Sequence, residues 1–436
     1  MKSLINCSKK LEQESDLRVP LSESSVVWQN GEKFPGTVGE MEEVSVLSVT
    51  QLSSPEALKA KFELKVDLTK TQLQYEPGDS LYFVFPNPIQ EVEYLLRRLK
   101  LITLADKEYS LSVLNDTKKD QAIVPAYIPP VCSLRYLFTW CVDIRRTPGR
   151  PLLRVLAEYA ENGERRRLLE LCSSQGVKEF TAFVRQAGLS LADLLHAFPS
   201  CVPPVERIIE LLPRLQPRPY SFACSPSASR KSARFVYSAV DIPSGDGRFY
   251  YRQGLCTGFL TALSPGTKVS VLLKEPSWFR LPQENATEIP LIMIGPGTGV
   301  GPFLGFLEKL SNSLASKSLV GPERWLFFGC RRLDHDYIYK EDLEEFVQMK
   351  LLTRLIVCES QPQMESHSEN NDVKVETPKR CKYVQDAVRK YGKELVNLIK
   401  AADGEVAETR IYVCGDAQGM SRDVFAALVD ILKEHC

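Results

Sequence analysis

The sequence predicts two kinds of structure in succession: an antiparallel β-barrel with a helical insertion, then a doubly wound α/β domain with a parallel sheet. Three observations predict this order. Residues 61–68 alternate strictly between polar and apolar side chains, as a half-buried antiparallel strand does. Apolar residues recur at helical spacing through much of residues 88–213. From residue 289 onward strands and helices alternate, which is typical of a parallel sheet covered on both faces.

The composition is that of a folded protein with two or three domains, at about 150 residues per domain. The 436 residues are 44% hydrophobic and 25% charged, enough for a full core. Basic and acidic residues number 55 each, so the formal charge is zero and we expect no nucleic-acid partner. No apolar run reaches membrane-spanning length, and the first residues lack the apolar core of a signal peptide. We therefore predict no membrane partner and a cytoplasmic location.

The cysteines and histidines argue against a metal site. The twelve cysteines form no C-x-x-C pair, and the chain has only four histidines. Many of the cysteines lie inside apolar segments, where a reduced thiol packs as a small hydrophobic group. We predict a reduced protein that holds no metal.

The first predicted domain covers residues 39–280 and follows a polar segment, residues 1–38, that is predicted to be a linker or disordered tail. Its strands are predicted at residues 61–68, 81–85, 218–224, 233–240 and 268–273. A Tyr-Glu-Pro-Gly-Asp turn lies at residues 75–79. The helices at about residues 88–213 are predicted to be an insertion, because strands resume after them.

The second predicted domain covers residues 286–436. Its strands are predicted at residues 289–294, 324–329, 354–358 and 410–414, and its helices begin at Pro302 and cover 339–349, 382–400 and 420–433. The polar residues 360–377 are predicted to form a loop or a disordered insert.

A glycine-rich loop, Gly295-Pro-Gly-Thr-Gly-Val-Gly301, lies between the first of these strands and the first helix. Backbone without side chains lets a diphosphate approach the amides, and the helix N-terminus adds a partial positive charge. The loop lacks the Gly-Lys-Ser/Thr ending of a nucleoside-triphosphate loop, and its glycines do not fit G-x-G-x-x-G. On this loop alone, a tight turn without a ligand remains the alternative.

Two further motifs precede this loop. Arg218-Pro-Tyr-Ser221 opens a strand and combines a guanidinium fork for phosphate, a flat ring and a short hydroxyl donor. Gly254-Leu-Cys-Thr257 is a glycine turn that offers a second backbone cradle for an anion. Each motif alone is more often structural, but their order, with the third glycine loop following, favours a joint role in binding.

Six phrases in this order resemble the ferredoxin-NADP reductase module of the diflavin reductase family. They are R-P-Y-S, G-L-C-T, I-G-P-G-T-G-V-G-P-F, F-F-G-C-R-R, K-Y-V-Q and Y-V-C-G-D-A, and the resemblance covers nearly all of residues 40–434. Residues 137–141 (L-F-T-W-C) and 215–221 (L-Q-P-R-P-Y-S) are most similar to the branch that reactivates cobalamin-dependent methionine synthase.

The resemblance implies two cofactors, FAD and NADPH. The residues that would hold FAD are Arg218, Pro219, Tyr220 and Ser221 at the ring, and Gly254, Leu255, Cys256 and Thr257 at the diphosphate. The residues that would hold NADPH are Lys59, Gly297, Thr298, Gly299, Ser360, Gln361, Tyr383, Val384, Gln385 and Asp423. Ser221 and Cys414 would be catalytic, near the reactive flavin nitrogen and the nicotinamide. An ordinary buried strand thiol remains the alternative for Cys414.

Three departures from the family pattern modify this expectation. The family usually places Ser-Arg where this chain has Ser360-Gln361, so the preference for NADPH over NADH should weaken unless Arg380 or Lys382 substitutes. The aromatic residue that ends family members is not found before Cys436, which predicts an unshielded flavin and looser coenzyme discrimination. Nothing resembles the family's FMN-binding domain, so the chain is interpreted as one half of an electron-transfer protein, or as a short isoform or fragment of one, to which an FMN domain could be supplied in trans.

The function predicted from this resemblance is that of an NADPH-dependent flavoprotein oxidoreductase. Hydride passes from the nicotinamide to FAD, and electrons then leave singly for an acceptor. The partner implied by the resemblance is methionine synthase. Two alternatives stay open: a non-catalytic module that binds methionine synthase or a full-length reductase, and, less favoured, a free-standing ferredoxin-type reductase.

Overall fold

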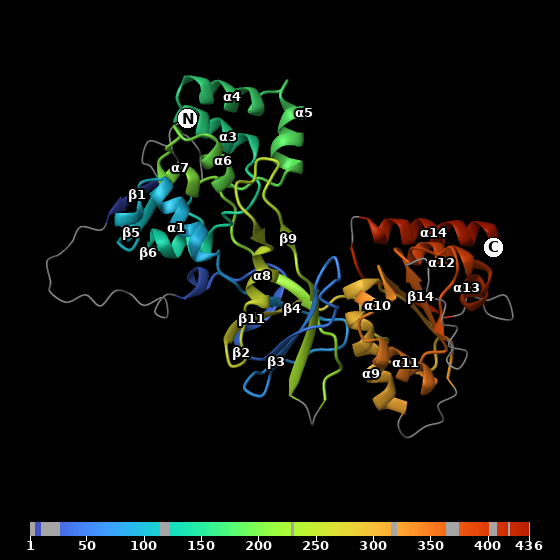
Figure 1. Ribbon diagram of the computed structural model, residues 1–436. Coiled ribbons are helices and arrows are strands. Elements are labelled where there is room, and N and C mark those ends of the chain that lie inside the picture. The colour runs from blue at the N-terminus through green and yellow to red at the C-terminus, as the bar shows by residue number, and fades with distance from the viewer. Residues whose placement is uncertain are drawn as a thin grey trace. The chain divides into compact units, whose positions relative to one another are not determined.

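The computed structural model describes residues 5–9, 27–113, 123–227, 231–314, 321–362, 375–400, 408–416 and 419–435 (Figure 1). The chain forms two compact units, which are described separately. The first comprises Met1–Pro35, Val84–Pro217 and Asp241–Phe259, and the second comprises Gly36–Phe83, Arg218–Val240 and Leu260–Cys436. The predicted boundaries at 1–38, 39–280 and 286–436 stay a prediction.

The first unit contains the predicted helical insertion. Its longer helices are α1 (Ile89–Arg98), α3 (Arg150–Glu158), α4 (Asn162–Cys172), α6 (Leu191–Ala197) and α7 (Val205–Ile209). Shorter helical segments are α2 (Leu134–Tyr136), α5 (Val177–Glu179), and two π-helical segments at Leu137–Cys141 and Phe180–Gln186. One hydrophobic core joins them, formed by the leucines of α1, α3 and α6 together with Phe138 and Ile208.

Strands at the margins of the first unit involve segments far apart in the sequence. A three-stranded antiparallel sheet has the order β1 (Ile5–Lys9), β5 (Glu108–Val113), β6 (Val131–Ser133). Of the predicted linker, residues 1–4 and 10–26 lie outside the described residues. A hairpin of β9 (Asp241–Ile242) and β10 (Arg252–Gln253) leads into the short helix α8 (Leu255–Thr261).

The predicted antiparallel barrel is confirmed in the second unit. Its strand order is β7 (Arg218–Ser221), β4 (Ser80–Phe83), β11 (Lys268–Lys274), β2 (Thr37–Gln51), β3 (Lys61–Asp67), β8 (Ser232–Ser238). An isolated bridge between Phe222 and Phe235 nearly closes the sheet. Phe83 and Phe235 meet edge to face inside it, with ring centroids 5.0 Å apart. Alternate strand residues point to the same side, and the apolar Leu64 and Val66 of the alternating segment 61–68 are fully buried in β3.

The Pro-Gly turn before β4 depends on its glycine. Gly78 has φ +100°, and a Cβ there would lie 1.8 Å from the carbonyl oxygen of Phe279. Asp79, which follows it, is 3% exposed and is paired by the guanidinium of Arg280. The turn is therefore a fixed contact with the segment that leaves β11.

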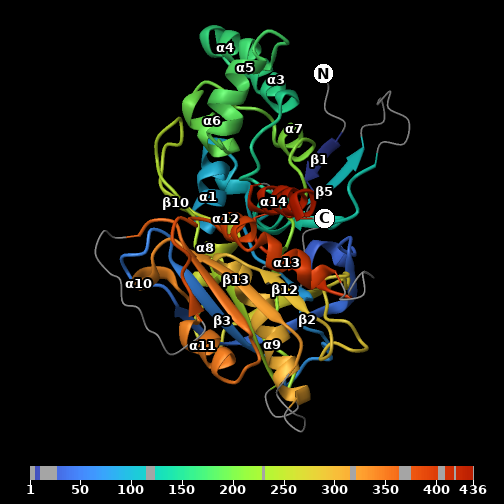
Figure 2. The ribbon, with the colours of Figure 1, turned by 90° about the vertical axis from the view of Figure 1, so that its right-hand side faces the viewer.

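The predicted doubly wound sheet is also confirmed. Its order is β15 (Val375–Glu376), β14 (Arg354–Glu359), β13 (Arg324–Cys330), β12 (Leu291–Ile294), β16 (Arg410–Val413), and every pair is parallel. Alternate residues of β12 enter opposite cores: Met293 packs with α9 (Gly301–Leu314) and α11 (Lys340–Gln348). Ile292 packs with α12 (Val384–Lys390), α13 (Gly392–Ile399) and α14 (Met420–His435). Figures 1 and 2 show these two groups of helices on opposite faces of the sheet.

One helix that was predicted to be continuous is broken in two. Residues 382–400 were expected to form a single helix, but Tyr391 separates α12 from α13. A Cβ on Gly392 would lie 2.7 Å from the side chain of Ile431 in α14. The break therefore lets the chain approach α14 closely at a glycine.

Two remaining observations concern the whole described chain. In the predicted insert at 360–377, residues 363–374 lie outside the described residues, while Ser360 and Gln361 are described. Across the described ranges, no helix is both long enough and apolar enough to cross a bilayer.

Candidate functional site

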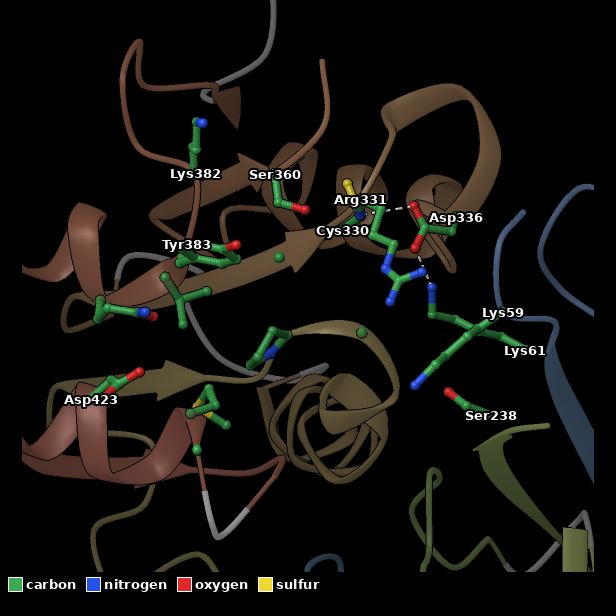
Figure 3. Close-up of a pocket in the computed structure, with 17 residues that line it drawn as sticks. Lys59, Lys61, Ser238, Cys330, Arg331, Asp336, Ser360, Lys382, Tyr383 and Asp423 are labelled. Carbon is green, nitrogen blue, oxygen red and sulfur yellow. Dashed lines mark hydrogen bonds and ion pairs between the residues drawn. The ribbon is translucent and has the colours of Figure 1, made fainter. Parts of the chain in front are cut away.

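A cavity of about 580 Å³ lies at the carboxyl ends of the parallel strands in the second unit (Figure 3). Ligands of open parallel sheets bind at this edge, where the strand order reverses. Here the reversal lies at β12, because the chain continues to β13 on one side and returns to β16 on the other. Its lining comes from the barrel, the strand ends and the helix starts: Lys59, Lys61, Ser238, Pro296, Gly297, Gly329, Cys330, Arg331, Asp336, Ser360, Lys382, Tyr383, Val384, Gln385, Gly419, Met420 and Asp423.

The predicted glycine loop forms one wall of this cavity, but its glycines serve different purposes. The loop turns through a short 3-10 segment, Gly297–Val300, and α9 begins at Gly301. A Cβ on Gly299 would lie 2.2 Å from the carbonyl oxygen of Cys414, so this glycine allows two backbone segments to meet. Gly297 lines the cavity with φ +56°, whereas Thr298 and Gly299 lie outside the lining. The tight-turn alternative therefore explains Gly299, and Gly297 is the member exposed to a ligand.

One cationic side chain of the cavity, Lys61, has its charge balanced by a buried carboxylate. Lys61 forms an ion pair with Asp336, and the two side chains are 8% and 6% exposed. Asp336 also accepts hydrogen bonds from the backbone N–H groups of Arg331 and Arg332, at 2.9 and 2.8 Å. The charge of Lys61 is thus already compensated by the protein, and Asp336 holds the loop after β13 in place.

Arg331 lines the cavity and carries a donor atom without a partner among the described residues. Its Nη1 atom is buried and has no hydrogen-bond partner among the described residues. A buried N–H group without a partner costs about 1–3 kcal/mol, more when it is charged. A phosphate oxygen in the cavity would satisfy this atom through a charge-assisted hydrogen bond. The chemistry of the lining therefore fits a phosphate-bearing coenzyme.

Lys59 and Lys382 add positive charge to the same cavity. Both side chains are exposed, and among the described residues neither has a carboxylate partner. Figure 3 shows Lys59 reaching from the barrel side and Lys382 from the segment before α12. Of the two residues that the sequence offered in place of the missing arginine at position 361, Lys382 lines the cavity and Arg380 does not.

The segment predicted to meet the adenosine end is brought together around the ends of β13 and β14. Ser360 and Gln361 donate backbone hydrogen bonds to Cys330 and Arg331, at 3.1 and 2.8 Å. Ser360 lines the cavity, and exposed Gln361 does not. The ring of Tyr383 is 55% exposed at the N-cap of α12. Its backbone N–H donates to Asp386 at 3.0 Å, which fixes the residue while its ring stays open to stacking.

Cys414 lies at the end of β16, outside the cavity lining, and is half-buried. Its backbone N–H donates to the carbonyl of Ile294 at 2.9 Å. Removal from water raises the pKa of its thiol to about 11. The thiol is therefore protonated at neutral pH, and its chemistry there is that of a neutral S–H group.

The barrel motif lies on β7, which pairs with β4 so that Ser221 opposes Ser80 and Arg218 opposes Phe83. The hydroxyls of Ser221 and Ser80 are 3.2 Å apart. The ring of Tyr220 is half-buried and meets Phe83 and Tyr237 edge-on, with centroids 5.8 and 5.9 Å away. This strand presents a positioned ring and a hydroxyl donor, with the guanidinium of Arg218 at its start.

The second predicted motif, Gly254–Thr257, belongs to the first unit and lies outside the barrel strands. Gly254 directly follows β10, and Leu255, Cys256 and Thr257 form the first turn of α8. The N–H of Gly258 donates to the carbonyl of Gly254 at 2.7 Å, which closes the turn. A Cβ on Gly258 would lie 2.9 Å from the Cβ of Gln253, so the turn is tightly packed.

Sequence reasoning missed the ion pair between Lys61 and Asp336 and the half-buried Arg331. Arg331 follows β13 within the F-F-G-C-R-R phrase, and its position at a strand's carboxyl end was a usable signal. Lys61 and Asp336 are 275 positions apart, so no local pattern relates them. Within the described ranges, no group of three or more His, Cys, Asp and Glu side chains is arranged to hold a metal ion.

Comparisons with known proteins agree with this geometry. A family model described as "FAD binding domain" matches residues 38–259, and one described as "Oxidoreductase NAD-binding domain" matches residues 293–425. The predicted pair of cofactor domains, one for FAD and one for a nicotinamide dinucleotide, is confirmed at this level.

Three curated relatives illustrate the similarity. Methionine synthase reductase of Caenorhabditis elegans is 43% identical over 99% of this chain and 64% of its own length. Methionine synthase reductase of Homo sapiens is 37% identical over 90% of this chain and 57% of its own. NADPH--cytochrome P450 reductase of Homo sapiens is 34% identical over 85% of this chain and 51% of its own. The chain thus spans between half and two thirds of the length of these relatives.

The predicted resemblance is therefore confirmed, with methionine synthase reductases among the similar proteins. The chain belongs to the family of flavin-dependent reductases in which this FAD binding domain precedes an oxidoreductase NAD-binding domain.

Proposed function

We propose that this chain takes hydride from NADPH onto FAD and passes the electrons on one at a time. The bound cofactors supply the redox chemistry, and the protein supplies binding, orientation and electrostatics. The single observation that supports NADPH most directly is the cavity with the unpartnered Nη1 of Arg331 and the open cations Lys59 and Lys382.

The roles proposed for the coenzyme cavity follow from charge and shape. Arg331, Lys59 and Lys382 bind phosphate groups, with Ser360 donating a hydroxyl hydrogen bond. Tyr383 offers its exposed ring to the adenine, as aromatic side chains stack on planar rings. Val384, Gln385 and Asp423 complete the wall formed by the helix starts. Gly297, Thr298 and Gly299 form the loop proposed to receive the diphosphate.

The roles proposed for the FAD residues rest on two motifs, one on barrel strand β7 and one at the turn into α8. Tyr220 lies against the flavin ring, Ser221 donates its hydroxyl near the reactive nitrogen, and Arg218 with Pro219 forms the start of the same strand. Gly254, Leu255, Cys256 and Thr257 receive the FAD diphosphate through backbone amides. Both motifs lie inside residues 38–259, the stretch that matches the FAD binding domain, which supports this assignment.

We propose methionine synthase as the protein partner, because several similar proteins are named methionine synthase reductase. The physiological acceptor would receive electrons from FAD through an FMN-binding domain. A cytoplasmic location also remains a proposal, supported by the cysteines whose side chains the structure describes, which are free and mostly buried.

The decisive experiment is to purify the chain and record its absorbance for bound flavin, with added FAD if it is colourless. NADPH-driven reduction of ferricyanide is then timed, with NADH in parallel. We expect one FAD per chain and turnover with NADPH. A colourless protein that FAD cannot reconstitute would overturn the proposal and leave the non-catalytic binding module as the better interpretation.

A further inference from the structure

In the first unit, the helical block holds the segment that leads into the Gly254–Thr257 turn at several positions. Arg248 donates to the carbonyl of Ala187, and the N–H of Phe249 donates to Asp193 at 3.3 Å. Arg252 forms an ion pair with Asp193 at 2.8 Å. The carbonyl of Gln253, the last residue before Gly254, accepts a hydrogen bond from Arg145.

Arg145 is itself fixed by a carboxylate. Its Nε and Nη2 atoms donate to the two oxygens of Glu91 on α1, at 2.8 and 2.5 Å. The two side chains are 12% and 10% exposed. A two-bond fork of this kind sets the plane of the guanidinium, so its third donor, Nη1, is directed at the Gln253 carbonyl.

A second buried pair holds the preceding residues. Arg252 and Asp193 are 3% and 0% exposed, and Asp193 also accepts from the backbone N–H of Ser190 at 2.8 Å at the start of α6. Arg252 donates to the carbonyl of Gly188 at 3.0 Å. The ring of Phe249 stacks on His196 with centroids 4.2 Å apart. These contacts leave little freedom to the backbone that leads into the turn.

Buried ion pairs are a poor means of holding helices together, since apolar residues of the same size stabilise a core as well or better. The first unit has such a core already. The direction of the Arg145 donor indicates another purpose. In a trans peptide, C=O and N–H point in opposite directions. Fixing the Gln253 carbonyl on Arg145 therefore also fixes the direction of the Gly254 N–H.

We propose that the helical block positions the turn that receives the FAD diphosphate, and that Arg145 is the positioning residue that orients the Gly254 amide. The inference rests on the proposed binding of FAD at Gly254–Thr257. A loop that binds through backbone amides gains affinity when those amides are already aimed before the ligand arrives. Arg145 would act on the diphosphate indirectly, through the direction of the Gly254 amide.

The test compares two flavins in the full chain stripped of flavin. FAD carries the diphosphate, and riboflavin has the same ring without phosphate. Affinities are measured by the change in flavin fluorescence on binding. For Arg145→Met, we expect the affinity for FAD to fall about 10- to 100-fold and that for riboflavin to change less than about threefold. Arg145→Lys keeps the positive charge and one donor nitrogen but loses the fork. It should recover part of the lost FAD affinity.

The matched control is Arg167→Met in the same unit, because Arg167 pairs with Glu179 at 2.7 Å on an exposed face of α4. This variant should leave the ratio of FAD to riboflavin affinity unchanged. If Arg145→Met does not fold, the double variant Glu91→Gln with Arg145→Met is measured in its place. The double variant leaves no uncompensated buried carboxylate.

Two results would overturn the inference. One is a ratio of FAD to riboflavin affinity that is unchanged in Arg145→Met or in the double variant, which would make the pair merely structural. The other is a wild-type chain that binds riboflavin and FAD equally, because no diphosphate contact would then exist to position. A wild-type chain that binds neither flavin overturns the proposed function itself, so the two failures are distinguishable.

Discussion

At the scale of single residues, two adjacent arginines show how surroundings decide function. The guanidinium of Arg332 pairs with the carboxylate of Asp334, to which its Nε donates a hydrogen bond at 2.9 Å. Arg331 has a buried Nη1 without a partner among the described residues, and it lines the cavity. The two residues have the same charge and nearly the same place in the chain. Arg331, the first of the pair, lines the cavity and offers a ligand a donor that has no partner among the described residues.

We predict that Arg331→Met raises the KM for NADPH about 10- to 100-fold, the range expected for losing a hydrogen bond to a charged group. Arg332→Met should change it less than about twofold, because an exposed ion pair contributes little. The measurement is the initial rate of ferricyanide reduction against NADPH concentration. Equal effects of the two substitutions would contradict the assignment of Arg331.

Cys414 gives a second prediction at this scale. Because burial raises the pKa of its thiol to about 11, the thiol stays protonated below about pH 10. The pH dependence of NADPH-driven reduction should therefore show no ionisation from this residue between about pH 6 and pH 9. Cys414→Ala should keep the shape of the wild-type profile, even if the rate falls. A limb of the profile that disappears in the variant would show that Cys414 titrates during turnover.

At the scale of elements, the buried pair of Lys61 and Asp336 ties the start of β3 to α10 (Leu333–Asp336). Replacing Lys61 by Met leaves the carboxylate of Asp336 buried without its counter-charge, although two backbone N–H groups still donate to it. Breaking a buried pair from one side costs about 3–5 kcal/mol, which is several times the value of an exposed pair.

We therefore predict that Lys61→Met lowers the free energy of unfolding by about 3–5 kcal/mol. This loss should appear as a clearly lower urea midpoint of unfolding. The control on the same strand is Lys65→Met, because Lys65 is 47% exposed where it pairs with Glu63. It should cost less than about 1 kcal/mol. Adding Asp336→Asn to Lys61→Met should restore part of the stability, since no buried charge then remains. A double variant less stable than Lys61→Met would contradict this account.

The elements themselves were largely predictable from local pattern. The alternation at β3 and the helical spacing of α14 follow from one side of an element facing a core, whereas the apolar run of β12 follows from burial on both of its faces. The break at Tyr391 was not predictable, because the close approach of Gly392 to Ile431 is a tertiary contact. The site followed the same division: the glycine loop was visible in sequence, whereas the pairing that neutralises Lys61 depends on residues 275 positions apart.

At the scale of the whole molecule, the coenzyme preference depends on charges contributed by separate parts of the chain. Lys59 comes from the barrel, Arg331 from a strand end and Lys382 from the segment before α12. The positive charge of Lys61 is not available to a coenzyme phosphate, because Asp336 compensates that charge. The sequence predicted that Gln361 weakens the preference for NADPH over NADH unless Arg380 or Lys382 substitutes. Lys382 lines the cavity together with Ser360, near the end of β14. It supplies there the positive charge that the uncharged Gln361 lacks.

We predict that the chain keeps a preference for NADPH over NADH and that Lys382 carries much of it. The extra 2′-phosphate of NADPH gains from a nearby ammonium group, although less than from a guanidinium fork, because lysine acts as a point charge. Lys382→Met should lower the ratio of kcat/KM for NADPH to that for NADH about tenfold, with the NADH value nearly unchanged. Lys379→Met, a substitution of an exposed lysine outside the cavity lining, should leave the ratio as it is. Raising the ionic strength should shrink the effect of Lys382, since that side chain is exposed and screened. If Lys382→Met and Lys379→Met behave alike, the preference comes from Lys59 and Arg331, and Gln361→Arg should then raise it.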